Sequence, residues 1–201
     1  MKLFFAPGFS SLADHIALRE ANLAFEIAEV DLESKRLRDG GNYLDVNPKG
    51  QVPALKFDDG EVLTENVAIL AWIADRAPHL AAPGELGRYQ LLEMLSFIAS
   101  EIHKRFPIYL SLPVDARGAI GADIVRWFSL VGPRLEHGYL FGPAFSVADA
   151  YLFVMARGAL QMEFPLGATF REYVARIEAR PAVQAALGSE GAPRPESGKT
   201  S

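Results

Sequence analysis

Two short stretches, residues 47–55 and 63–66, carry the groups that could hold a small peptide. Pro53 comes just before an apolar strand signal, and proline, which has no N–H to donate, is tolerated at the first residue or the edge of a strand. Such an edge leaves the backbone of Val52 free to pair with an extended ligand. Glu65 and Asn66 stand at a predicted helix start, where backbone N–H groups attract a carboxylate. The two stretches together predict a small-peptide binding site.

Ser10 and Ser11 are the candidate hydroxyl groups for chemistry. Both lie at the predicted start of the first helix, where a serine either acts on a ligand or caps the helix. For Ser11 capping is the stronger interpretation, because Asp14 follows three residues later and the pair reads as a capping box. Both serines stay candidates for the catalytic group.

His103 is the candidate imidazole. It falls with Ser96 and Ser100 at i, i+4 and i+7, which predicts a polar stripe on a helix that is otherwise packed with apolar residues. A single histidine on a helix is more often a surface or satisfied core residue, so both interpretations stay open. As a site residue it would hydrogen bond near the reacting groups.

The composition narrows the class of protein. The chain has 201 residues, half of them apolar, and a net charge of −5. Residues 1–80 hold 13 acidic against 8 basic side chains, which argues against nucleic acid as a partner. The absence of cysteine excludes disulfides, thiolate metal sites and redox chemistry by a protein thiol. We find no pattern typical of a metal site, a phosphate-binding loop or a hydrolase triad.

The amino-terminal sequence bears on location. The apolar run of residues 3–6 is too short for a signal peptide before Pro7 and Gly8 interrupt it, and no stretch approaches transmembrane length. We therefore expect a cytoplasmic protein with no membrane partner.

The elements expected to position these residues form two groups. Residues 1–78 predict strand, helix and strand, then a hairpin and a second helix, with a polar loop at 35–41. This βαβ-ββα order is the thioredoxin-like arrangement. Residues 79–87 read as a linker and 88–190 as an all-helical domain, whose first helix should be broken by Pro107. Ser146 and Asp149 form a second capping box, and residues 191–201 predict a disordered tail.

Six segments, residues 6–8, 15–20, 47–55, 63–65, 101–104 and 145–153, resemble the bacterial beta-class glutathione transferases in order and near-register spacing. The resemblance covers about residues 1–190. It implies an α/β thioredoxin-like N-terminal domain plus an all-α C-terminal domain, a homodimer, and a cis bond before Pro53. It also implies glutathione as co-substrate and a small apolar electrophile as the second substrate.

Carried over by position, the resemblance implies a glutathione site of nine residues: Ser10, Lys35, Val52, Pro53, Glu65, Asn66, Ser96, Ser100 and His103. Val52 would offer its N–H and C=O to the cysteinyl backbone of glutathione. Glu65 would pair with the α-amino group, although an acid there also suits the helix dipole. Lys35 could reach the glycyl carboxylate.

The chain departs from the family pattern at several positions. Ser10 stands where the family has its hallmark cysteine, Ser96 where it usually has asparagine, and Asn66 where glycine is common. The region after residue 106 is shorter than usual, so the substrate pocket cannot be transferred. Three apolar residues are candidates for that pocket, with a plain core role equally open: Phe106, Ile108 and Tyr109.

A serine is sufficient to ionise the glutathione thiol on energetic grounds. A free thiol of pKa about 8.5 must shift by about 1.5 units, or roughly 2 kcal/mol, to be half ionised at neutral pH. One charge-assisted hydrogen bond supplies about 1.5–3 kcal/mol, and a helix N-terminus adds about 0.3–1 kcal/mol. We therefore expect a glutathione transferase in which a serine hydroxyl holds the thiolate.

Two alternatives remain open. The lost cysteine and asparagine also fit a glutathione-fold binding protein that does not turn over a substrate. A glutathione-dependent thiol–disulfide reductase or peroxidase is disfavoured, because the chain has no sulfur nucleophile of its own.

Overall fold

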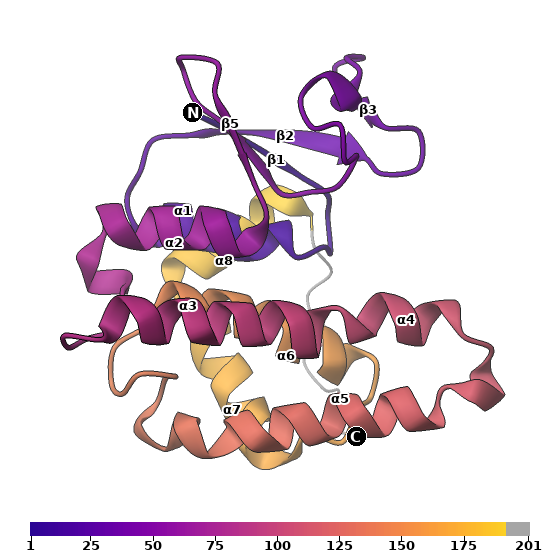
Figure 1. Cartoon of the computed structure of the whole chain (residues 1–201), viewed down its shortest axis with the longest axis vertical. Coiled ribbons are helices and arrows are strands. Elements are labelled where there is room, and N and C mark those ends of the chain that lie inside the picture. Colours follow the sequence, from indigo (N-terminus) through magenta and orange to yellow (C-terminus); the bar gives the residue numbers. More distant parts are fainter. Residues whose placement is uncertain (192–201) are drawn as a thin grey trace, which may run out of the picture.

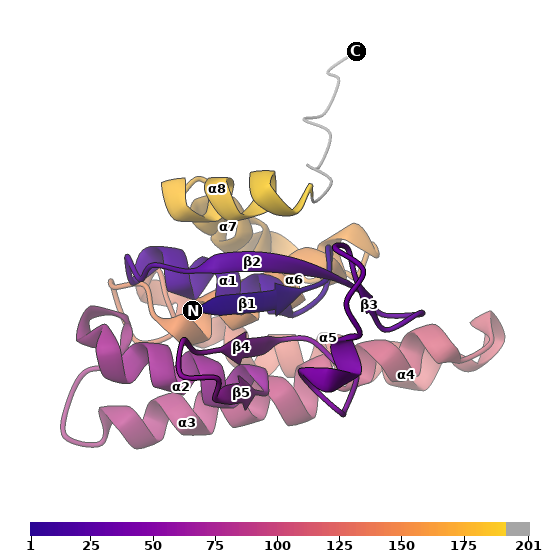
Figure 2. The same cartoon turned by 90° about the horizontal axis from the view of Figure 1, so that it is seen from above.

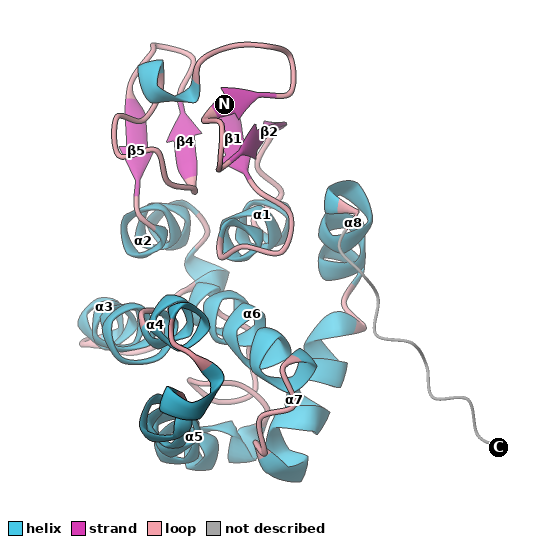
Figure 3. Cartoon of the chain, turned by 90° about the vertical axis from the view of Figure 1, so that its right-hand side faces the viewer, coloured by secondary structure: helices cyan, strands magenta, loops and turns pink. Residues whose placement is uncertain are grey.

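The computed structural model describes residues 1–191. Its N-terminal part is a five-stranded sheet in the order β3-β2-β1-β4-β5, in which β1 and β2 are parallel and the other pairs antiparallel. Helices α1 and α2 lie against one face of this sheet (Figures 1 and 3). The bounds are β1 Lys2–Phe5, α1 Ser11–Glu20, β2 Glu26–Asp31, β3 Arg36–Leu37, β4 Ala54–Lys56, β5 Val62–Thr64 and α2 Asn66–Arg76. The predicted βαβ-ββα, thioredoxin-like order is confirmed.

Alternation along the strands explains why the sheet has two different faces. Leu3 and Leu55 are register partners in β1 and β4, and both are fully buried in the core shared with α1 and α2. Their neighbours Phe4 and Ala54 point to the other face, where they pack in a small cluster with Tyr43. The loop that contains Tyr43 thus covers the face that the helices leave open.

The rest of the described chain, up to residue 191, is mainly helical. Its elements are α3 Gly87–Phe97, a π-helical segment Ile98–His103, α4 Arg105–Ser111, α5 Gly118–Val131, α6 Val147–Gln161, α7 Gly167–Glu178 and α8 Pro181–Glu190. Helix α6 is buried along most of its length and contacts both α1 and α2, so one apolar core runs through both parts. Figures 2 and 3 show α8 beside α1, on the side away from α2. Across residues 1–191, no helix is both long and apolar enough to cross a bilayer.

Two specific sequence predictions are confirmed. The peptide bond between Val52 and Pro53 is cis. Ser146 and Asp149 form the capping box at the start of α6, in which each side chain accepts from the other residue's backbone N–H. All but the first residue of the predicted tail at 191–201 lies outside the described residues.

Two predictions near the N-terminus are wrong. Ser11 and Asp14 form no capping box: Ser11 is the first residue of α1, its hydroxyl bonds to Ala6, and Asp14 accepts from Asn66 instead. Tertiary partners therefore take both side chains away from the local motif. The polar loop at 35–41 contains β3, because the edge of β2 offers its backbone groups to any neighbouring extended segment.

The prediction that Pro107 breaks the helix is also wrong. Pro107 is the third residue of α4, and a proline in a first turn removes no hydrogen bond that the helix needs. The chain changes pitch earlier, in the π-helical segment at 98–103. A single-turn π segment is a rare feature that apolar periodicity does not reveal.

Candidate active site

A cleft of about 620 Å³ lies between the sheet loops and the helical part of the chain. This volume falls in the range of small-molecule sites. Its walls come from the loop before α1, the loop before β4, the start of α2, the π-helical segment and α6. Of the predicted site residues it gathers seven: Ser10, Lys35, Val52, Pro53, Glu65, Asn66 and His103. A larger hollow of about 910 Å³ beside α1 and α8 contains none of them.

The backbone of Val52 is held in place by hydrogen bonds of neighbouring residues and not by hydrogen bonds of its own. The carbonyl of Gln51 accepts from the Tyr43 hydroxyl and from Asn47 Nδ2, both at 2.7 Å. Among the residues that the structure describes, neither the N–H nor the C=O of Val52 has a hydrogen-bond partner. Val52 thus presents a free strand edge in the cleft, as the spacing before Pro53 predicts. Sequence reasoning missed the buried Asn47, whose side chain ties this loop together.

The charged end of the cleft lies at the start of α2. Glu65 precedes the helix with a φ of 77°, a backbone conformation that is costly for a residue with a side chain. Its carboxylate pairs with Lys49, which also donates to the Thr64 hydroxyl. Lys35 reaches across the same loop and donates to the carbonyl of Gly50 at 2.9 Å. The ammonium and carboxylate groups in this region are partly exposed, so a ligand can exchange with these surface pairs at small cost.

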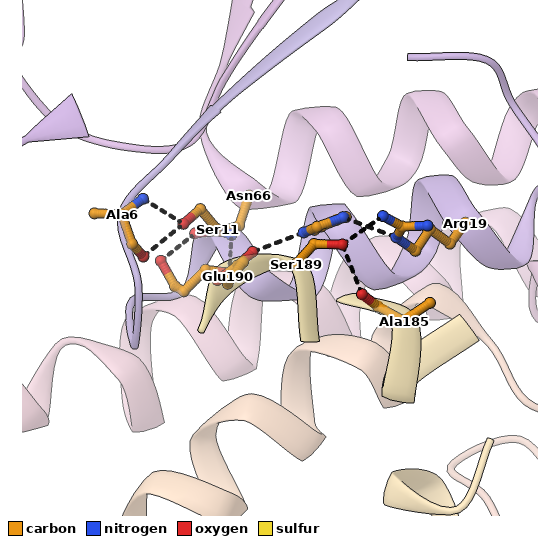
Figure 4. Close-up of polar contacts among 9 residues, drawn as sticks. Ala6, Ser11, Arg19, Asn66, Ala185, Ser189 and Glu190 are labelled. Atoms are coloured by element: carbon orange, nitrogen blue, oxygen red, sulfur yellow. Dashed lines mark hydrogen bonds and ion pairs between the residues drawn. The ribbon is translucent and has the colours of Figure 1, made fainter. Parts of the chain in front are cut away.

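The two adjacent serines have different surroundings. Ser10 lines the cleft, and its Oγ donates to Oδ1 of Asn66 at 3.0 Å. Ser11 is fully buried, accepts from the N–H of Ala6 at 3.2 Å and donates to its carbonyl at 3.4 Å (Figure 4). The structure therefore brings Ser10 to the cleft and does not bring Ser11 there.

A buried pair stands behind Ser10. Asn66 Nδ2 donates to the backbone carbonyl of Ser10 at 3.0 Å and to Oδ2 of Asp14 at 2.6 Å. Asp14 is fully buried, and this burial raises the pKa of its carboxyl well above the usual range despite the bond from Asn66. Sequence reasoning assigned Asp14 to a cap, and nothing local reveals a partner 52 residues away.

His103 reaches the cleft from the π-helical segment. Its Nδ1 lies 2.7 Å from the hydroxyl of Tyr151 on α6, and the two rings meet edge to face. Burial lowers the pKa of His103, so its imidazole stays neutral near pH 7. Burial, followed by the charges of Asp14 and Glu65, raises the pKa of Tyr151, so the phenol keeps its proton. Sequence reasoning missed Tyr151 as a site residue.

The other two members of the predicted stripe lie elsewhere. Ser96 and Ser100 are exposed and do not line the cleft, and the Ser100 hydroxyl donates to Glu101 at 3.1 Å. A straight α-helix would align them with His103, but the wider π turn at 98–103 rotates one end of the helix against the other. The residues of this segment that line the cleft are Ala99 and His103.

The predicted apolar pocket residues turn away from the cleft. The rings of Phe106 and Tyr109 pack against Phe164 with centroids 6.2 and 5.0 Å apart. Ile108 is 40% exposed, and none of the three lines the cleft. The apolar cleft wall is formed instead by residues from both parts of the chain: Phe9, Leu32, Val67, Ala99 and Pro107.

Comparisons with known proteins show which family the chain belongs to. Residues 14–76 match the family model for the N-terminal domain of glutathione S-transferases. Glutathione S-transferase GstA of Escherichia coli O157:H7 is 42% identical over 200 residues, which cover 95% of this chain and 99% of that protein. The structure of the bacterial beta-class glutathione S-transferase of Sphingomonas chungbukensis is 42% identical, with a TM-score of 0.85 over 95% of this chain and 99% of that one. A sphingomonad glutathione S-transferase complexed with glutathione is 44% identical, with a TM-score of 0.84 over 95% and 99%. The chain therefore belongs to the glutathione S-transferase family of enzymes, beside its bacterial beta-class members.

Proposed function

We propose that the chain conjugates glutathione to a small apolar electrophile and that the Ser10 hydroxyl stabilises the attacking thiolate. The observation that carries this proposal is the position of Ser10, which lines the cleft and immediately precedes the first residue of α1. A hydroxyl and a helix start together supply the roughly 2 kcal/mol that ionisation at neutral pH requires.

The remaining cleft residues account for the rest of the glutathione molecule. The free N–H and C=O of Val52 pair with the cysteinyl backbone. The N-terminus of α2 receives the γ-glutamyl carboxylate, and Glu65 takes the α-amino group by exchanging its bond with Lys49. Lys35 reaches the glycyl carboxylate from the Gly50 side of the cleft.

The electrophile lies on the apolar side of the sulfur. Phe9, which is 52% exposed, and Pro107 of α4 both line the cleft. A neutral His103, held by Tyr151, can hydrogen bond to the electrophile or its leaving group without competing for the thiolate as a cation would.

A binding protein without turnover is the second candidate. Two observations favour it: the chain has no cysteine, and Ser96, which stands where the family usually has asparagine, does not line the cleft. Calorimetry with glutathione, followed by a conjugation assay with a panel of activated aryl halides, separates the candidates. We expect saturable binding and conjugation; saturable binding with no conjugation or dehalogenation of any electrophile would defeat the transferase proposal.

We also infer that the protein is a homodimer, as its resemblance to the beta class implies. Exposed apolar side chains at the start of α3, Leu86 at 62% and Tyr89 at 66%, support an interface there. Sedimentation should give the mass of two chains, and a single-chain mass at micromolar concentration would refute this inference.

A further inference from the structure

The side chain of Asn66 has only one orientation that satisfies its neighbours. Its amide lies between three groups: the backbone carbonyl of Ser10, Oδ2 of Asp14 and Oγ of Ser10. A carbonyl oxygen can only accept, and Oδ2 of Asp14 accepts at 2.6 Å. Both acceptors need the amide nitrogen, so the amide oxygen must face the Ser10 hydroxyl.

This orientation decides where the Ser10 hydrogen goes. An amide oxygen can only accept, so Ser10 Oγ donates its hydrogen to Asn66 and presents its lone pairs to the cleft. In the ligand-free protein the hydroxyl is therefore set to accept from a thiol, and is not set to donate to a thiolate. Asn66 is 7% exposed and Asp14 is fully buried, so water does not replace either contact readily.

We propose that Asp14 and Asn66 are positioning residues that hold the hydrogen of the Ser10 hydroxyl away from the cleft until the glutathione thiol ionises. This inference rests on the proposed role of Ser10 in glutathione activation. The thiol of bound glutathione first donates its S–H to Ser10 Oγ. When the sulfur ionises and its proton leaves to solvent, the Ser10 hydrogen turns from the Asn66 oxygen to the thiolate.

Asn66, held by Asp14, thus competes with the thiolate for the hydrogen of the Ser10 hydroxyl. This competition predicts the direction in which the two residues shift the pKa of bound glutathione. Releasing Ser10 from Asn66 should stabilise the thiolate and lower the pKa of bound glutathione. A competing neutral hydrogen bond corresponds to a shift of about half a pKa unit to one unit. Both residues must be replaced together, because Asn66 is the side chain that donates to Asp14 and a single change would leave a buried carboxyl without it.

The test is a double-mutant cycle on the pKa of bound glutathione, read from thiolate absorbance. The pair variant Asp14→Ala/Asn66→Ala is measured with Ser10 present and in the Ser10→Ala background. We expect the thiol pKa to fall by about half a unit or more with Ser10 present, and to change much less in the Ser10→Ala background. An equal fall in both backgrounds would mean a direct effect of the Asp14 charge and would overturn the proposal, as would no change or a rise with Ser10 present.

This cycle also separates the two proposals. If Ser10→Ala alone leaves the thiol pKa unchanged, the role of Ser10 fails and the inference falls with it. If Ser10→Ala raises the pKa while the pair variant has no effect, only the inference about Asp14 and Asn66 fails.

A second measurement uses the unaltered protein and so does not depend on the folding of any variant. The side-chain amide signals of Asn66 in a ¹⁵N NMR spectrum should shift with the pKa of the bound thiol, because the Ser10 hydrogen then leaves the amide oxygen. With S-methylglutathione, which has no ionisable thiol, they should stay constant over the same pH range. Amide signals that ignore thiol ionisation would contradict the proposal.

Discussion

At the scale of single residues, the tertiary contacts of a side chain decide whether it lines the cleft. Ser10 and Ser11 differ by one position, yet one lines the cleft and the other bonds to Ala6. The sequence singled out Ser10 through its position in the family resemblance. The contacts of Asp14 with Asn66, across 52 residues, depend on how α1 packs against α2 and have no local signal.

His103 offers a prediction at this scale. Burial lowers its pKa in the folded protein, so the unfolded chain binds a proton that folded His103 does not. The contribution of His103 to the free energy of unfolding should therefore be fully present above the unfolded pKa of about 6.5. It should fall as the pH drops from there toward the lower pKa of folded His103. NMR titration of the four imidazoles should show His103 titrating below 6.5. A value at or above 6.5 would refute the assignment of a neutral ring.

At the scale of elements, local signals succeeded where the partners are close in sequence. The capping box at Ser146 and Asp149 was predicted because both groups lie within one turn, and the structure contains it. The predicted break at Pro107 failed because this proline lies in the first turn of α4. The predicted stripe through Ser96 failed because the π-helical segment changes the helix phase. Apolar periodicity in the sequence does not reveal such a segment.

Asp149, in the first turn of α6, should make the stability of the protein depend on pH. Burial raises the pKa of its carboxyl from 3.8 to about 6, against the lowering effect of donors from Ser146, Leu140 and Tyr173. As the pH rises, Asp149 therefore loses its proton at a lower pH in the unfolded chain than in the folded protein. The free energy of unfolding should fall by up to about 3 kcal/mol between about pH 4 and pH 6, and should stay constant above about pH 6. Urea unfolding of wild type and Asp149→Asn at several pH values checks this. The variant should lack this component of the pH dependence, and equal slopes in the two proteins would contradict it.

At the scale of the whole molecule, the last helix returns to the first. Glu190 at the end of α8 is buried against α1, and its Oε1 lies 2.8 Å from Nδ1 of His15 (Figure 4). Arg19 donates to the other ring nitrogen of His15 and to the hydroxyl of Ser189. At the start of α8, Arg180 binds the carboxylate of Glu20 through two nitrogens. The sequence predicted an all-helical domain at 88–190 but could not show that its last helix packs on the N-terminal part.

The buried contact predicts a large stability effect. Glu190→Ala leaves the Nδ1–H of the His15 ring, which is neutral because its Nε2 accepts from Arg19, without an acceptor in a buried environment, and this costs about 1–3 kcal/mol. Urea unfolding should show this loss, while the exposed Glu172→Ala on α7 should change stability by less than about 0.5 kcal/mol. Equal effects of the two substitutions would show that α8 is not held to α1 by this contact.

The proposed function depends on the hydrogen bond by which Ser10 ionises glutathione. The most direct measurement is the pKa of bound glutathione, from near-ultraviolet thiolate absorbance, in wild type, Ser10→Ala and Ser11→Ala. Losing a charge-assisted hydrogen bond should raise that pKa by about 1–2 units in Ser10→Ala, and Ser11→Ala should leave it unchanged. An unchanged pKa in Ser10→Ala, with glutathione bound to saturation, would contradict the account.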